Sequence, residues 1–134
     1  MAPEPTRVSI RHEADILIAR KAARAMAVRL RFSETDLVLI ATAISEIARN
    51  MLTYARRGDL TFEEATDASR RGIVVTATDE GPGIADVERA MEDGYSSGGG
   101  LGLGLPGARR LMDEFSIESK VGAGTTIIMK KWTT

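Results

Sequence analysis

Residues Leu37 to Ala55 read LVLIATAISEIARNMLTYA, and this stretch decides the fold of the chain. Its apolar residues recur at intervals of three and four, which is the spacing of one buried face of an amphipathic helix. Ser33, followed three residues later by Asp36, is a pair that commonly opens such a helix. The stretch therefore predicts a long central helix with one broad apolar face, made of Leu37, Ile40, Ala41, Ile44, Ala48, Met51, Leu52 and Ala55.

The opposite side of this helix carries few charges. Between Asp36 and Glu46 there is none, so we expect a second element to cover this side as well. Glu46 and Asn50 stand four residues apart, which places them next to each other on a helix. Two interpretations are open: each side chain has a hydrogen-bond partner inside the fold, or the pair carries chemistry.

The composition is that of an ordinary globular domain. The chain has 134 residues, and we expect one domain over residues 1–134 with a loose tail at 1–6. A net charge of −1 gives no field that would attract nucleic acid or an anionic membrane, and without cysteine there are no disulfides or thiolate metal sites. No signal peptide and no membrane-spanning run can be recognised, so we expect a cytoplasmic protein.

The order of the other segments predicts an α+β fold. Short alternating runs indicate strands, and longer runs of helical spacing indicate helices. We expect a two-layer sandwich in which a mixed, mainly antiparallel sheet carries helices on one face. The predicted strands are Arg7–Arg11, Leu60–Ala65, Ile73–Thr78, Phe115–Val121 and Thr125–Trp132; the further helices are Asp15–Leu30, Val87–Met91 and Leu105–Glu114; turns are predicted at Gly58-Asp59 and Arg70–Gly72.

The run Asp79-Glu-Gly81-Pro-Gly83 follows a predicted strand. Glycine has no Cβ, so a backbone with two close glycines can approach a flat ring while a carboxylate accepts the N–H of that ring. A plain turn with the same D-x-G-x-G pattern is the alternative.

The segment from Gly94 to Gly107 holds seven of the thirteen glycines of the chain. It leads into a predicted helix, whose first turn offers free N–H groups to a phosphate. A flexible linker is the alternative, although the leucines at alternate positions argue against it. Gly102-x-Gly104-x-x-Gly107 matches the glycine pattern of the dinucleotide-binding motif, but no predicted strand precedes it, so the required βαβ context is missing. The sequence also contains no P-loop motif. Further on, Gly122-Ala-Gly124-Thr125-Thr126 by itself indicates a hairpin turn that opens the last strand.

Taken together and in this order, the four motifs resemble the GHKL, or Bergerat-fold, family of DNA gyrase, heat-shock protein 90, histidine kinases and MutL. The segments Ala43–Asn50, Met91–Gly98 and Arg110–Phe115 are similar to the RsbT-type serine/threonine kinases of the bacterial stressosome. The likeness runs from about Val8 to Trp132.

The resemblance implies a role for each matching residue. Asn50 would hold Mg²⁺ through its amide oxygen, and Glu46 would be the general base toward the attacking hydroxyl. Asp79 would bind the amino group of adenine, and Thr125 would support the ring. The glycines divide into two groups: Gly81 and Gly83 would line adenine, and a lid over the phosphates would be formed by Gly98, Gly100, Gly102 and Gly104.

The implied activity is that of an ATP- and Mg²⁺-dependent protein serine/threonine kinase. Its substrates would be STAS-domain antagonist and scaffold proteins of the stressosome, and its release would activate a phosphatase partner. The open alternative is a nucleotide-dependent anti-factor that sequesters a partner with little or no phosphate transfer. No role in contact with nucleic acid or a membrane is expected.

The chain departs from the histidine kinase pattern at two places. Thr53 stands where histidine kinases often carry a lysine, so the cation that neutralises the phosphates is unassigned. Arg109 or Arg110 could serve, and the favoured alternative is that both are ordinary surface arginines. His12 is followed by a glutamate as in a phosphorylated histidine site, but only eleven residues precede it and the helical hairpin of such a site does not fit.

Overall fold

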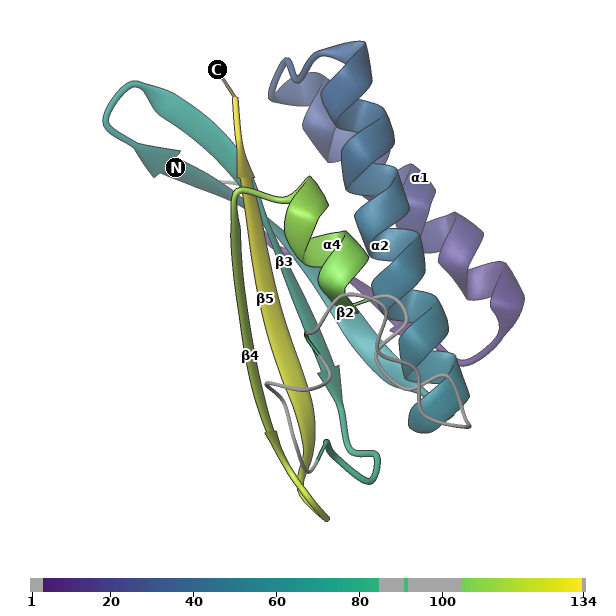
Figure 1. Ribbon diagram of the computed structural model, residues 1–134. Coiled ribbons are helices and arrows are strands. Elements are labelled where there is room, and N and C mark those ends of the chain that lie inside the picture. The colour runs from purple at the N-terminus through teal and green to yellow at the C-terminus, as the bar shows by residue number, and fades with distance from the viewer. Residues whose placement is uncertain (1–3, 85–90, 92–104, 134) are drawn as a thin grey trace.

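The computed structural model describes residues 4–84, 91 and 105–133 of the chain. They form a five-stranded sheet with helices on one face, which confirms the predicted α+β sandwich (Figure 1). The strand order is β1-β2-β3-β5-β4, and every pair in the described sheet is antiparallel. The elements are β1 (Thr6–Ile10), α1 (Glu13–Arg29), α2 (Glu34–Tyr54), β2 (Gly58–Asp67), β3 (Arg70–Asp79), α4 (Leu105–Leu111), β4 (Glu114–Lys120) and β5 (Gly124–Trp132).

The central helix α2 begins where the sequence predicts. The Ser33 side chain accepts the backbone N–H of Asp36 at 3.1 Å and so caps the first turn. The helix ends at Tyr54, one residue before the predicted end, and Arg56 then takes a left-handed φ of 70° as the chain turns toward β2.

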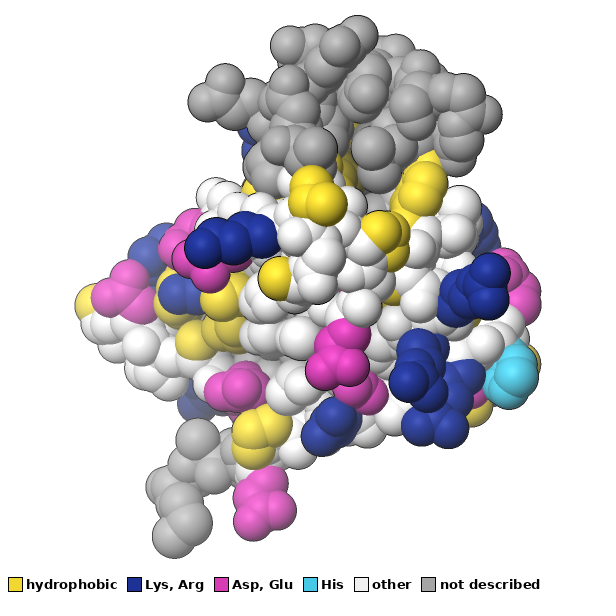
Figure 2. All heavy atoms as spheres, turned by 90° about the horizontal axis from the view of Figure 1, so that it is seen from below, with side chains coloured by type: hydrophobic (Ala, Val, Ile, Leu, Met, Phe, Trp, Pro, Cys, Tyr) yellow, Lys and Arg dark blue, Asp and Glu magenta, His cyan; other side chains and the backbone are white. Residues whose placement is uncertain are grey.

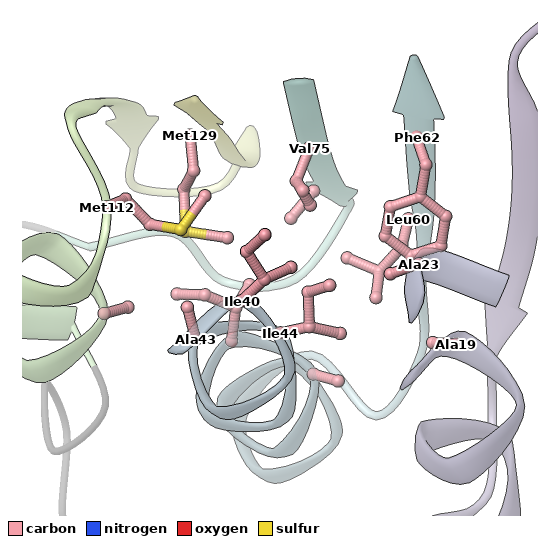
Figure 3. Packing of buried hydrophobic residues seen from close by; sticks show 14 of the residues in the cluster. Ala19, Ala23, Ile40, Ala43, Ile44, Leu60, Phe62, Val75, Met112 and Met129 are labelled. Atoms are coloured by element: carbon pink, nitrogen blue, oxygen red, sulfur yellow. The ribbon is translucent and has the colours of Figure 1, made fainter. Parts of the chain in front are cut away.

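Helix α2 lies between the sheet, α1 and α4, which explains its shortage of charge. Ala43, on the side away from the predicted apolar face, is fully buried. Figure 3 shows Ile40 and Ala43 close to Met112 and Met129, and Ile44 facing Leu60 and Phe62. Burying each large apolar side chain of this core contributes about 1.5–3 kcal/mol. The covering element expected for the second side of the helix is therefore α4.

The register of the sheet places the ends of two strands together. Asp79, the last residue of β3, is paired with Thr125 near the start of β5. Directly paired residues of an antiparallel sheet point to the same face. Both side chains therefore point to the helix-covered face, beside the C-terminal half of α2.

Both predicted turns are wrong, for a packing reason. Gly58 and Asp59 belong to β2, and Gly72 belongs to β3; the hairpin turns instead at Ala68, whose φ is 54°. A Cβ at Gly58 would collide with the side chain of Met51, and one at Gly72 would lie 2.6 Å from Trp132. These two glycines make room for neighbours inside the fold rather than for a change of chain direction.

Helix α4 ends at Leu111, three residues before the predicted end at Glu114. The buried Lys131 donates to the carbonyl of Leu111, and Asp113 already accepts the backbone N–H of Trp132 at 2.7 Å. The predicted helix Val87–Met91 lies outside the described residues except for Met91. In the described part of the chain, no helix has the length and apolarity needed to cross a membrane.

Candidate functional site

A cavity of about 180 Å³ opens between α2 and the paired ends of β3 and β5. Its walls are mostly apolar, with four side chains that carry polar groups set into them. The apolar residues come from helix, sheet and loop, and they are Ile47, Met51, Ala55, Ala77, Pro82, Ile84 and Ile127. The polar groups are those of Asn50, Asp79 and Thr125 and the hydroxyl of Tyr54. An apolar slot with a few convergent polar groups is typical of a site for a flat organic ring.

Asp79 is the charged group of the cavity wall. Burial raises the pKa of its carboxyl, while hydrogen bonds from the backbone of Gly81 and Thr125 act in the opposite direction. The N–H of Gly81 donates to this carboxylate at 2.9 Å. The carboxylate is thus held in place by the backbone, and its remaining lone pairs are available to a donor in the cavity.

The loop after Asp79 lies directly on the turn between β4 and β5. Gly83 has a φ of 78°, and a Cβ there would overlap the carbonyl of Lys120. The N–H of Gly122 donates to the carbonyl of Pro82 at 2.8 Å, which joins the same two segments. Gly124, with a φ of 82°, lies against the backbone of Asp79. The D-x-G-x-G and G-x-G-T-T motifs therefore form one structure, although each alone is compatible with an independent turn.

Gly81 and Gly83 do different things. Gly83 lines the cavity. Gly81 instead faces the end of α2, where a Cβ would lie 2.6 Å from the Cβ of Ala55. Gly81 thus lets the loop approach the helix, and the residues of this loop that line the cavity are Pro82, Gly83 and Ile84.

Glu46 and Asn50 lie on the predicted helix, and both are partly buried. Asn50 lines the cavity, whereas Glu46 is one turn further from the end of α2 and is not part of the cavity wall. Among the described residues, neither the carboxylate of Glu46 nor the amide of Asn50 has a hydrogen-bond or ion-pair partner. The structural interpretation, in which each is satisfied inside the fold, therefore finds no support in the described residues.

The amide of Asn50 fits the requirements of a Mg²⁺ ligand. It is an oxygen donor at the edge of the cavity with no protein partner in the described part of the chain. The described residues contain no cluster of three acidic or histidine side chains that could hold a metal alone. A Mg²⁺ ion retains several waters and takes further oxygens from phosphates, so one amide ligand is sufficient.

The phosphate-neutralising cation remains unassigned. Arg109 and Arg110 are both exposed on α4. The hydroxyl of Thr53 donates to the carbonyl of Arg49 at 3.0 Å, within its own helix. The proposed lid residues Gly98, Gly100, Gly102 and Gly104 lie outside the described residues.

A second, polar hollow adjoins the cavity at the same end of the molecule. Arg7, Arg11 and Arg57 line it, together with Asp59, and it shares Asp79 with the cavity. Figure 2 views the molecule from this end and shows Lys and Arg side chains gathered beside acidic ones. Arg7 forms an ion pair with Asp59 at 2.8 Å, so the positive charge of Arg7 is balanced within the hollow.

Sequence reasoning missed Ser119, which connects three parts of the site. Its hydroxyl lies 2.7 Å from the backbone nitrogen of Ile84, 3.0 Å from the carbonyl of Gly124 and 2.7 Å from the hydroxyl of Thr125. The signal was present in the alternation of β4. Phe115 and Ile117 point to the core, so Ser119 is a polar residue on an otherwise apolar face.

The sequence is similar to proteins of one kind over almost its whole length. The sequence profile of the histidine kinase-like ATPase domain matches residues 11–131. The serine/threonine-protein kinase RsbT of Bacillus subtilis (strain 168) is 49% identical over 125 residues, covering 93% of this chain and 94% of RsbT. The anti-sigma F factor of Clostridium novyi (strain NT) is 33% identical over 118 residues, covering 84% of this chain and 82% of that protein.

Solved structures with a similar fold are histidine kinase domains. The catalytic domain of the histidine kinase ThkA superimposes with a TM-score of 0.58 at 16% identity, covering 98% of this chain and 99% of that one. The mycobacterial sensor histidine kinase MprB gives a TM-score of 0.54 at 18% identity, covering 96% of each chain. At this identity the likeness concerns the fold, and it confirms the architecture expected from the sequence.

Proposed function

The chain belongs to the histidine kinase-like ATPase family, and from this premise we propose that it is an ATP-dependent protein serine/threonine kinase of the RsbT type. One observation carries the proposal: the acceptor groups of Asp79 and Thr125 and the amide of Asn50 converge on a single apolar cavity. This set would provide acceptors for a ring and an oxygen ligand for a metal–phosphate group in one cavity.

In the proposed complex, adenine lies between the apolar walls and donates its amino N–H to Asp79. Asn50 would hold Mg²⁺ together with the phosphate oxygens. When bound, Mg²⁺ offsets the negative charge of the phosphates, which is a main requirement of phosphoryl transfer. The lid role of Gly98, Gly100, Gly102 and Gly104 is part of the same proposal.

Glu46 would act on the incoming protein substrate rather than on the nucleotide. It is only partly buried and stands outside the cavity wall, one turn from Asn50. A serine or threonine hydroxyl of the partner attacks the γ-phosphorus, and its proton passes to the Glu46 carboxylate. The bond between the γ-phosphorus and the bridging oxygen breaks, and ADP leaves. A carboxylate without a partner among the described residues suits a base that meets its substrate only in the complex.

We propose STAS-domain antagonist and scaffold proteins as the substrates, with release from them allowing the chain to activate a phosphatase in the cytoplasm. Support for this comes from the 49% identity to RsbT. The test is transfer of labelled γ-phosphate from ATP to purified STAS-domain proteins, with and without a chelator of Mg²⁺. We expect Mg²⁺-dependent label on serine or threonine; its absence from every STAS protein that binds the chain would contradict the kinase proposal.

A second candidate is a nucleotide-dependent anti-factor that sequesters its partner. The observation in its favour is the 33% identity to an anti-sigma F factor over most of the chain. The two candidates differ in the product. An anti-factor forms a stable complex in the presence of nucleotide while the partner stays unphosphorylated, whereas a kinase labels the partner and then releases it.

A further inference from the structure

Ser119 contacts two residues that line the cavity, Ile84 and Thr125. It lies on the core side of β4, and its hydroxyl contacts the N–H of Ile84, the carbonyl of Gly124 and the hydroxyl of Thr125. Two of these partners have fixed roles. A backbone N–H can only donate and a carbonyl can only accept, so only the contact with Thr125 could run in either direction.

The distance between the two hydroxyls allows either of them to donate, and we assign the single proton of Ser119 to the carbonyl of Gly124. Ser119 accepts from Ile84 and donates to Gly124, which is 3.0 Å away. Because Ser119 has no second proton, the 2.7 Å contact with Thr125 is made by the proton of Thr125. The Thr125 oxygen therefore has only lone pairs left for the cavity that it lines.

Asp79 has the same character. Its ionised carboxylate is an acceptor only, and it is paired with Thr125 across β3 and β5. Two neighbouring acceptors complement a ring that presents N–H donors. A ring with a carbonyl oxygen in place of the donor would bring its acceptor against those of Asp79 and Thr125. None of these acceptors would then have a hydrogen-bond donor.

From this geometry we infer that Ser119 is a specificity-determining positioning residue. By accepting the hydrogen bond of the Thr125 hydroxyl, it makes the cavity select 6-aminopurine over 6-oxopurine nucleotides. The inference deepens the proposed function and rests on it. Ser119 acts through Thr125 and the backbone of Ile84, so its predicted effect is on which purine ring the cavity binds.

The test compares ATP with inosine triphosphate, which carries a carbonyl oxygen in place of the 6-amino group. Calorimetry gives the Kd of both for the wild type and for Ser119→Ala. We expect the wild type to prefer ATP by at least about 100-fold, since sites built around a substrate N–H reject analogues that lack it. In Ser119→Ala the Thr125 hydroxyl is free to rotate and donate, and the preference should fall about tenfold, the equivalent of one hydrogen bond.

The matched control is Ser116→Ala, on the exposed face of the same strand, which should leave the preference unchanged. Thr125→Val provides a second arm that leaves Ser119 bound to Ile84 and Gly124. If the Thr125 hydroxyl only accepts hydrogen bonds from the ring, this change lowers the affinity for ATP. The affinity for inosine triphosphate then stays the same or rises. Adding Ser119→Ala to Thr125→Val should then change the preference no further, because the rotating hydroxyl is gone.

The inference is overturned if a folded Ser119→Ala protein keeps the full preference for ATP over inosine triphosphate. It is also overturned if Thr125→Val weakens the binding of inosine triphosphate more than the binding of ATP. The Thr125→Val arm decides the matter should Ser119→Ala fail to fold. Failure of the proposed function has a different signature. A wild type that binds neither nucleotide refutes the ATP site itself. A wild type that binds both equally refutes the selection of the 6-amino group by Thr125 and Asp79 while leaving a nucleotide site in place.

Discussion

Asp79 and Thr125 are direct partners across the antiparallel strands β3 and β5, and both line the cavity beside α2. Residues 46 positions apart in the sequence thus form one side of the candidate site. The sheet register sets this arrangement, and the loop contacts of Gly83 and Gly124 hold it in place.

Asp79→Asn should weaken ATP binding in a protein that remains folded. The amide replaces an acceptor-only group with one that also presents donors to the adenine amino group. The loss should be about 1.5–3 kcal/mol, the contribution of a hydrogen bond to a charged group. Calorimetric titration with ATP measures it, and the exposed neighbour change Glu80→Gln is the control. Equal ATP affinity of Asp79→Asn and wild type would refute the adenine assignment.

The same substitution should change how stability without nucleotide depends on pH. Burial raises the pKa of the Asp79 carboxyl, so the folded state binds more protons than the unfolded state between the two pKa values. The wild type therefore loses stability as the pH rises from about 4, the ordinary value, to the raised pKa of the folded state. Asp79→Asn has no such loss.

Denaturant unfolding of both nucleotide-free proteins across this pH range measures the effect. The stability of Asp79→Asn relative to the wild type should increase through the window and then stay level. A difference that shrinks as the pH rises would show that the backbone hydrogen bonds from Gly81 and Thr125, rather than burial, dominate the pKa of Asp79.

Gly83→Ala should destabilise the protein more than Gly122→Ala does. Both positions have a left-handed φ, of 78° and 82°, which costs a residue with a Cβ about 1–2 kcal/mol. A Cβ at Gly83 would also overlap the carbonyl of Lys120, whereas one at Gly122 meets nothing within 4 Å. Denaturant unfolding compares the two. Equal losses would mean that the contact between the loop and the β4–β5 turn is unimportant for stability.

Gly102→Val and Gly104→Val should reduce nucleotide binding while leaving the melting temperature without nucleotide nearly unchanged. The reason is the glycine density of the segment, which suits a loop that closes over phosphates. Gly107→Ala in α4 is the control, because a Cβ there meets nothing within 4 Å. Unfolding of both valine variants in the absence of nucleotide would mean that these glycines serve the fold.

The sequence predicts the order of the elements well because each described one has a clear period. The face of α2 and the alternation of β5 are local patterns that follow from burial. The turn predictions failed because Gly58 and Gly72 make room for the side chains of Met51 and Trp132, and both contacts form only when separate elements pack together. A local pattern cannot distinguish such a glycine from one that turns the chain.

The candidate site, too, was predictable from the sequence only in part. The motifs locate Asn50, Asp79 and Thr125, which the structure brings to one cavity. The role of Ser119 depends on three contacts that exist only after β4, β5 and the loop after β3 have come together. Its place on a core-facing position of β4 was readable from alternation, but its partners were not.

The central claim is that a nucleotide site and a separate base on α2 together transfer phosphate. Asn50→Asp should impair binding of Mg²⁺–ATP, because it changes the charge and the donor pattern of a proposed ligand. Glu46 stands outside the cavity wall, so Glu46→Gln should leave both ATP affinity and melting temperature close to those of the wild type. The two variants therefore separate binding from chemistry on one helix.

The most direct measurement is the single-turnover rate of phosphate transfer from ATP to a STAS-domain partner by wild type and Glu46→Gln. The account predicts measurable transfer by the wild type and a rate lower by about 10²–10⁴-fold for Glu46→Gln, the usual effect of losing a positioned base. A folded, ATP-binding Glu46→Gln protein that transfers phosphate at the wild-type rate would contradict it.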